Sequence, residues 1–125
     1  MKHLTSVFSI LLLITICACS DIPAPDTCLD PENAESANWL QTIIDEMEND
    51  TSQFAIYGYI TTGTYDGQRI FIIKNCCVSC SYVAPVYSCS GQSLGFLSYQ
   101  GNGVHPDHID GEELFWKRSD SVCTI

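Results

Sequence analysis

The sequence predicts a small α+β domain, in which one N-terminal amphipathic helix packs on an antiparallel β-meander and disulfides brace the fold. Three observations predict this class. Apolar residues recur at helical spacing between Trp39 and Met47, and strand-like segments separated by turn residues follow from Phe54 onward. Cysteines then gather between Cys76 and Cys89, which is typical of a small domain held together by covalent cross-links.

The helix has a recognisable start and two distinct sides. Asp30-Pro31-Glu32 supplies a capping acceptor, a proline for the first turn and an acid at the positive end of the helix dipole. One side carries the apolar residues Trp39, Leu40, Ile43, Ile44 and Met47, and the other carries Gln41, Asp45, Glu46 and Glu48. We expect the helix to end near Asn49-Asp50 and to pack its apolar side on a sheet.

Strand signals follow the helix. The alternation from Phe54 to Thr61 predicts a strand that turns Phe54, Ile56, Gly58 and Ile60 toward the helix. Asp66-Gly67 predicts a tight hairpin into the segment QRIFIIK, and Gly63 is expected at a bulge. Further strands are expected over 85–89 and 94–98, a loop over 101–113, and a last short element of either type over 114–117.

The first twenty residues have the features of an export signal. A basic start precedes an uncharged run from Leu4 to Ile16, which is shorter than the about 20 apolar residues that a membrane-spanning helix needs. Ile16-Cys17-Ala18-Cys19 resembles a bacterial lipobox. That resemblance implies cleavage after Ala18 and acylation of Cys19 with chains such as palmitate. An ordinary secretory signal and an uncleaved anchor are the alternatives.

The residues after Cys19 indicate a location and a domain division. Ser20 favours the outer membrane under the familiar sorting rule, and Asp21 is similar to the acidic export signals of surface-exposed Bacteroidota lipoproteins. We therefore expect a cell-envelope protein, periplasmic or surface-exposed, whose membrane partner is reached through its own lipid anchor. The division is a signal peptide over 1–18, a lipidated cysteine with its tether over 19–29, and one small domain over 30–125.

Charge and missing motifs exclude several classes of function. Without residues 1–18, the chain keeps four basic side chains against fifteen acidic ones. Such a field repels nucleic acid and anionic head groups, so no nucleic-acid partner is expected. The sequence holds no phosphate-binding loop, no dinucleotide fingerprint and no G-x-S-x-G elbow. We therefore expect neither a cofactor nor an enzyme.

Six cysteines remain after the predicted processing, and export through an oxidising compartment favours pairing them as disulfides. They are Cys28, Cys76, Cys77, Cys80, Cys89 and Cys123. The adjacent Cys76 and Cys77 should reach different neighbours, and we expect one of them to pair with Cys89. Cys28 or Cys123 would pair with the remaining members. A zinc site and a redox-active C-x-x-C at Cys77 and Cys80 are the alternatives.

Two further groups of residues are candidate sites. His105, Asp107, His108 and Asp110 could bind Zn²⁺ or Ca²⁺, although Pro106 opposes a helix that would align the two imidazoles, and a solvated acidic loop is the alternative. Tyr57 and Tyr59 should lie on the sheet face that points away from the helix. There they could form a contact surface or ordinary cross-strand pairs.

Scattered residues resemble a family of short Bacteroidota lipoprotein domains of unknown function. They are Trp39-Leu40, Ile43-Ile44, Tyr59, Gly67-Gln68, Cys76-Cys77, Val86-Tyr87 and Gly91, within a match over roughly 36–104. In that family an acid usually follows the cysteine doublet, whereas Val78 follows it here, and the glycine-rich tail is shorter here. The family has no established activity, so the resemblance implies architecture and location and no catalytic residue.

Together these features predict an outer-membrane-anchored envelope lipoprotein that serves as a non-enzymatic binding or structural module. Its partner would be a protein or a glycan. A periplasmic metal-binding protein that uses the His105 loop and a thiol oxidoreductase that uses Cys77 and Cys80 are the alternative functions.

Overall fold

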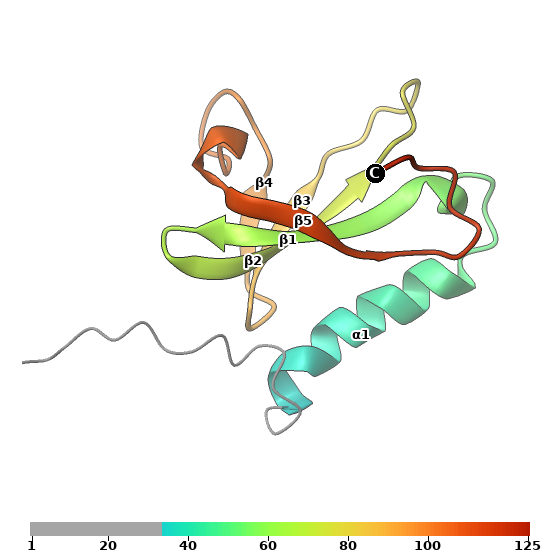
Figure 1. The fold of residues 1–125 in the computed structure, drawn as a ribbon, viewed down its shortest axis with the longest axis horizontal. Coiled ribbons are helices and arrows are strands. Elements are labelled where there is room, and N and C mark those ends of the chain that lie inside the picture. The colour runs from blue at the N-terminus through green and yellow to red at the C-terminus, as the bar shows by residue number, and fades with distance from the viewer. Residues whose placement is uncertain (1–33) are drawn as a thin grey trace, which may run out of the picture.

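The computed structural model describes residues 34–125 and, within the helix, side chains from residue 38 onward. The predictions for the signal segment, Cys19, the tether, Cys28 and the helix opening at Asp30 lie outside the described residues. One helix and a five-stranded antiparallel sheet confirm the α+β class (Figure 1). The helix α1 (Ala34–Asn49) is the first described element but does not stand at the N-terminus of the chain, so that part of the prediction is wrong.

Helix α1 lies along one side of the sheet and buries the side that its sequence predicts (Figure 1). Leu40 and Ile44 are buried against Ile60, Phe71 and Ile73 of the sheet. The half-buried residues Trp39, Ile43 and Met47 complete the contact. The helix ends at Asn49, as expected. Helical periodicity predicts the buried side of α1 correctly because its apolar residues pack on a single surface, the face of the sheet.

The segment before the first strand differs from the prediction. Residues Ala55–Tyr57 form a 3₁₀ turn, and Phe54 is 51 % exposed instead of lying under the helix. The N–H of Ala55 donates to the carbonyl of Ser52 at 3.1 Å, and the N–H of Tyr57 donates to that of Phe54 at 3.1 Å. The chain must reverse direction soon after Asn49, and these i→i+3 bonds make the reversal at the expense of the β pattern.

The central hairpin follows the sequence closely. Strands β1 (Gly58–Tyr65) and β2 (Gln68–Asn75) pair along their whole length, and Asp66 and Gly67 both adopt positive φ. Two consecutive left-handed residues fit the right-handed twist of a hairpin, which is why Asp-Gly predicts it. β2 buries four consecutive apolar residues, since it is covered on both faces.

The order of strands is β4-β3-β2-β1-β5, so the meander is confirmed only for β1 to β4. β3 (Pro85–Ser88) and β4 (Ser93–Phe96) are short and follow on one side. The expected loop over 101–113 holds a 3₁₀ turn (Pro106–His108) and the start of β5 (Asp110–Lys117), which pairs with β1 at the opposite edge. Its register shifts across Gly63, where a bulge was expected.

The segment between β4 and β5 covers the second face of the sheet. Val104, 2 % exposed, packs on Ile70, Ile72 and Val86, with Leu97 and Ile109 beside it. The sheet therefore has a helix on one face and a loop on the other, and both clusters meet at β2. No helix within residues 34–125 combines the length and the apolar character needed to cross a bilayer.

Candidate functional site

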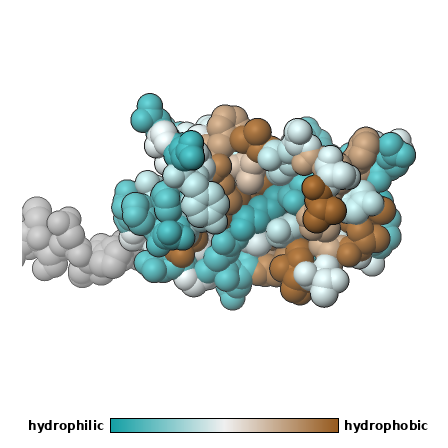
Figure 2. Space-filling model, turned by 90° about the horizontal axis from the view of Figure 1, so that it is seen from above, coloured by the Kyte–Doolittle hydropathy of each residue, from teal (hydrophilic) through white to brown (hydrophobic). Residues whose placement is uncertain are grey.

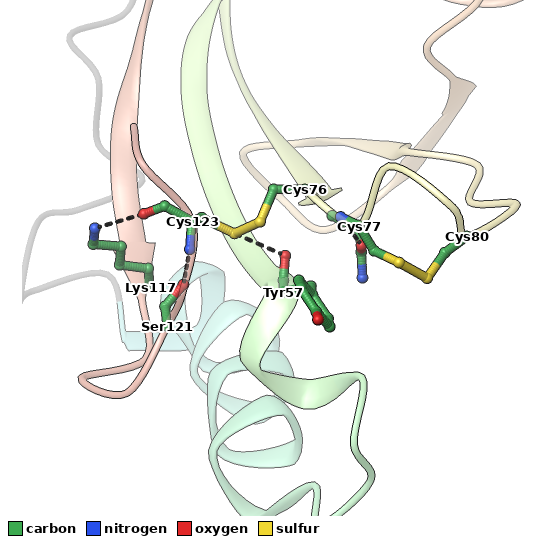
Figure 3. Close-up of a disulfide and its surroundings, with 8 residues drawn as sticks. Tyr57, Cys76, Cys77, Cys80, Lys117, Ser121 and Cys123 are labelled. Carbon is green, nitrogen blue, oxygen red and sulfur yellow. Dashed lines mark hydrogen bonds between the residues drawn. A yellow bond between two sulfur atoms is a disulfide. The ribbon is translucent and has the colours of Figure 1, made fainter.

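Two disulfides leave the end of β2 in different directions (Figure 3). Cys76 bonds to Cys123, which is 4 % exposed, and Cys77 bonds to Cys80 three residues later. Cys89 is also disulfide-bonded. The adjacent cysteines reach different neighbours, as expected, but pairing either of them with Cys89 was wrong. Pairing depends on which chain ends meet in space, and the position of the segment after β5 was not evident from the sequence.

The Cys76–Cys123 bond joins β2 to the segment after β5 (Figure 3). The N–H of Cys76 donates to the carbonyl of Tyr57 at 3.0 Å, and the sulfur of Cys123 lies 3.2 Å from the same oxygen. The second distance is a contact and not a hydrogen bond, because a disulfide sulfur carries no proton. Lys117 donates to the carbonyl of Cys123 at 3.3 Å. The Cys123 end of the bond is thus buried, whereas Cys76 is half-buried.

Tyr57 and Tyr59, expected as a contact surface or as ordinary cross-strand pairs, do not lie on one strand. Tyr57 belongs to the 3₁₀ turn and not to a strand, whereas Tyr59 lies on β1 between Lys74 and Lys117. Both are half-buried. The premise that the two side chains share one face of a single strand is therefore wrong, because the strand begins only at Gly58.

The histidine loop is arranged around a 3₁₀ turn. The Nδ1 of His105 accepts from the N–H of Asp107 at 3.3 Å, and its ring contacts the rings of Tyr99 and His108, with centroids 5.4 and 5.2 Å away. Asp110 opens β5 opposite Thr64. Across residues 34–125, no three histidine, cysteine, aspartate or glutamate side chains stand where they could share a metal ion.

An aromatic hollow at one end of the sheet was not predicted. Its volume is about 570 Å³, and it is lined by Phe54, Asn75, Ser79, Cys80, Ser81 and Tyr82. A second hollow of about 300 Å³ shares Phe54, Asn75 and Tyr82 and continues over Ala55 toward Met47. We call the two together the Phe54–Tyr82 groove. Asp50 and Lys74 also line the smaller hollow.

Two aromatic side chains of the groove, Phe54 and Tyr82, are exposed to solvent, and a hydrogen bond orients Tyr82. Phe54 is 51 % exposed and Tyr82 is 45 % exposed. The hydroxyl of Tyr82 donates to the carbonyl of Ile73 at 3.3 Å. Burial, followed by the neighbouring Tyr87 phenol, raises the pKa of Tyr82, so its hydroxyl stays a donor near neutral pH. Figure 2 shows that hydrophobic residues form separate patches on the face it presents, rather than one continuous apolar surface.

Arg118 ties the end of α1 to the segment that follows β5. Its Nη1 donates to the carbonyls of Met47, Glu48 and Asp50 at 3.0, 3.3 and 2.8 Å. Its Nε and Nη2 donate to the two carboxylate oxygens of Asp120 at 2.8 and 3.0 Å. This contact raises the pKa of Arg118 and lowers the pKa of Asp120. The guanidinium thus binds the carbonyls at the end of α1, which helices otherwise leave without partners.

Glu112 ties β5 to the hairpin. One of its oxygens accepts from the Thr61 hydroxyl at 2.6 Å and from the Lys74 ammonium. Burial alone would raise the pKa of Glu112, but the bonds from Lys74 and Thr61 and the charge of Lys74 together lower it. The carboxylate is therefore ionised and paired, which indicates a structural contact rather than a proton-transfer group.

Comparison with protein families, with curated proteins and with solved structures finds no match to this chain. Neither the Phe54–Tyr82 groove nor Arg118 had been singled out from the sequence. The pair Tyr82-Val83, which follows the C-x-x-C after Ser81, is a local signal for such a groove, since apolar side chains in a loop have no strand or helix to cover them.

Proposed function

We propose that this chain is a cell-envelope lipoprotein, held at the outer membrane through an acylated Cys19, whose domain is a non-enzymatic binding module. The lipobox-like residues and the resemblance to short Bacteroidota lipoprotein domains support the anchor. Disulfides in the described domain are in keeping with export to an oxidising compartment. The binding role is supported by a different part of the molecule.

The Phe54–Tyr82 groove is the observation that carries the binding role. Two exposed aromatic side chains border adjoining hollows of about 570 and about 300 Å³. Aromatic residues at the walls of a concave surface are the usual anchors of protein recognition, because they give large contact area with few rotors to immobilise. The disulfide at Cys80 and the 3₁₀ turn at Ala55 keep both walls in a fixed conformation.

The lining favours a protein segment that inserts an apolar side chain. Phe54, Ala55, Met47 and Ile73 form an apolar surface, and the side chains of Asn75, Ser79 and Ser81 add hydrogen-bonding groups. Asp50 and Lys74 both line the groove and carry opposite charges, so the selection comes from the formal charge of −10 of the whole chain, which favours an uncharged or basic segment over an acidic one. A glycan partner is the outcome that would contradict this choice.

Replacing Cys19 by serine should abolish the anchor. In cells grown with a clickable palmitate analogue, the full chain should incorporate label and fractionate with the outer membrane. The Cys19→Ser variant should do neither, because the acyl chains supply the membrane affinity. Cys17→Ser is the matched control and should still be labelled. An unlabelled wild-type chain retained in the cytosol would contradict the anchor and with it the envelope location.

Replacing Phe54 and Tyr82 together by alanine should weaken partner capture from envelope extract by about tenfold or more, since aromatic anchors contribute on the order of 1–2 kcal/mol each. Immobilised full chain is compared with the double variant by quantitative mass spectrometry of retained proteins. Tyr99→Ala is the control, because Tyr99 is 73 % exposed and lines neither hollow. Equal capture by all three chains, or retained material that is glycan and not protein, would refute the proposal.

A further inference from the structure

The second disulfide closes a surface turn instead of joining distant segments. Cys77 and Cys80 flank Val78, which is fully exposed, and Ser79, which is exposed as well. The N–H of Cys80 donates to the carbonyl of Cys77 at 3.3 Å, so the four residues form a tight turn. Both of its cysteines are half-buried, whereas Cys123 of the other bond is 4 % exposed. Cys76 is half-buried too, so the Cys77–Cys80 bond has two half-buried cysteines and the Cys76–Cys123 bond has one. The Cys77–Cys80 bond is thus the more accessible of the two to a thiol in solution.

The two sulfurs of this bond have different surroundings. Cys80 lines the larger hollow of the Phe54–Tyr82 groove, beside Ser81 and Tyr82, and Cys77 does not. The sulfur of Cys77 lies instead 3.7 Å from the hydroxyl oxygen of Ser79. Its backbone N–H donates to the side-chain oxygen of Asn75 at 2.8 Å, which fixes the start of the turn. Figure 3 shows the bond on a loop that points away from the Cys76–Cys123 cross-link.

We propose that Cys77–Cys80 is an exchangeable disulfide, with Cys80 as the sulfur that an incoming thiol attacks and Cys77 as the leaving sulfur. A thiolate that enters the groove approaches Cys80. The Ser79 hydroxyl can donate a hydrogen bond to the thiolate that forms on Cys77, and a stabilised leaving group departs faster. The compounds that would react are thiols with an apolar body, such as a cysteine beside an aromatic residue in a protein segment.

The step balances without any further reactant. The incoming thiolate forms a bond to the sulfur of Cys80, the Cys77–Cys80 bond breaks, and its electron pair leaves on Cys77, which takes a proton from solvent. The product is a mixed disulfide on Cys80 and a free thiol on Cys77. A second thiol then attacks the mixed disulfide at the incoming sulfur, the bond to Cys80 breaks, and Cys80 takes a proton from solvent. The two incoming thiols leave joined as a disulfide, and the Cys77–Cys80 disulfide has been reduced to two thiols. This chemistry is a reaction of the disulfide itself and not the retention of a partner, so it goes beyond the binding function proposed above.

Limited reaction of the oxidised full chain with reduced glutathione tests the proposal. The reaction is quenched with N-ethylmaleimide, and peptides are mapped by mass spectrometry. Cys77 and Cys80 should open at least about tenfold faster than Cys76 and Cys123. At early times glutathione should be found on Cys80 and the maleimide on Cys77. Equal opening of the two disulfides would overturn the proposal, as would glutathione found mainly on Cys77.

Replacing Ser79 tests whether the hydrogen bond to the Cys77 leaving sulfur, and not the exposure of the disulfide alone, makes the exchange fast. Ser79→Ala should slow glutathione addition about threefold or more, since the hydrogen bond to the departing sulfur is lost. Ser81→Ala is the matched control, because Ser81 lines the same hollow but is in neither hydrogen bond of the turn. Its rate should equal that of the wild type. A Ser79→Ala chain that reacts as fast as the wild type would refute the assignment of Cys77 as the leaving sulfur.

Discussion

Replacing both Cys76 and Cys123 by serine should lower the free energy of unfolding by about 4 kcal/mol, the largest loss that we expect from any pair of cysteines described here. The bond closes a loop with a sequence separation of 47, and the stabilisation grows with the logarithm of that length because the cross-link restricts the unfolded chain. The loss would be a large fraction of the total stability of a domain of this size. Urea unfolding of the oxidised chain measures it.

The Cys77→Ser and Cys80→Ser double variant is the control. Its bond spans a sequence separation of 3, so the same relation gives only about 1–2 kcal/mol. The two double variants remove the same number of sulfur atoms and differ mainly in the loop released. A loss at the surface turn as large as the loss at Cys76–Cys123 would show that the enclosed loop is not what stabilises the fold.

Replacing Trp39 by alanine should destabilise the domain by about 3 kcal/mol, because a half-buried aromatic ring leaves a cavity between the helix and the sheet. The ring packs on Phe71 and Tyr87, with centroids 5.8 and 5.4 Å away, and its Nε1 donates to the carbonyl of Cys89 at 3.0 Å. A Cβ on Gly91 would lie 2.6 Å from the same ring. The indole thus joins α1 to the turn between β3 and β4.

Trp39→Phe divides this loss into its parts. Phenylalanine keeps one aromatic ring to pack on Phe71, but it removes the hydrogen bond and the second ring of the indole, so we expect about 1–2 kcal/mol. Thermal and urea unfolding of both variants provide the comparison. If phenylalanine destabilised as much as alanine, the hydrogen bond to Cys89, and not the packing of the ring, would be the main contribution at this position.

The parts of the fold that the sequence predicted are those determined by neighbours along the chain. The helical spacing from Trp39 to Met47 places the buried side of α1 correctly, and Asp66-Gly67 places the hairpin, since each signal needs only a few adjacent residues. β5 was not predicted as a full strand. Its first half, Asp110 to Glu113, is acidic and contains glycine, and it becomes a strand only because β1 offers it an unpaired edge.

The candidate sites were harder to predict, for the same physical reason. The cysteine doublet correctly indicated two separate disulfides, but six cysteines allow many pairings, and the choice depends on where the segment after β5 lies. The groove is formed by Phe54 before β1 and Tyr82 before β3, which are brought together by the turn at Ala55 and the Cys77–Cys80 bond. Nothing in the separate segments indicates that they meet.

The outer strands of the sheet bear on how the protein behaves at high concentration. A strand edge can recruit a second copy through its open backbone groups and begin aggregation. β4 has only four residues, and on β5 the exposed side chains of Asp110 and Glu113 give neighbouring copies like charge. Molecules at high concentration would therefore repel each other at the β5 edge, which opposes the growth of a shared sheet.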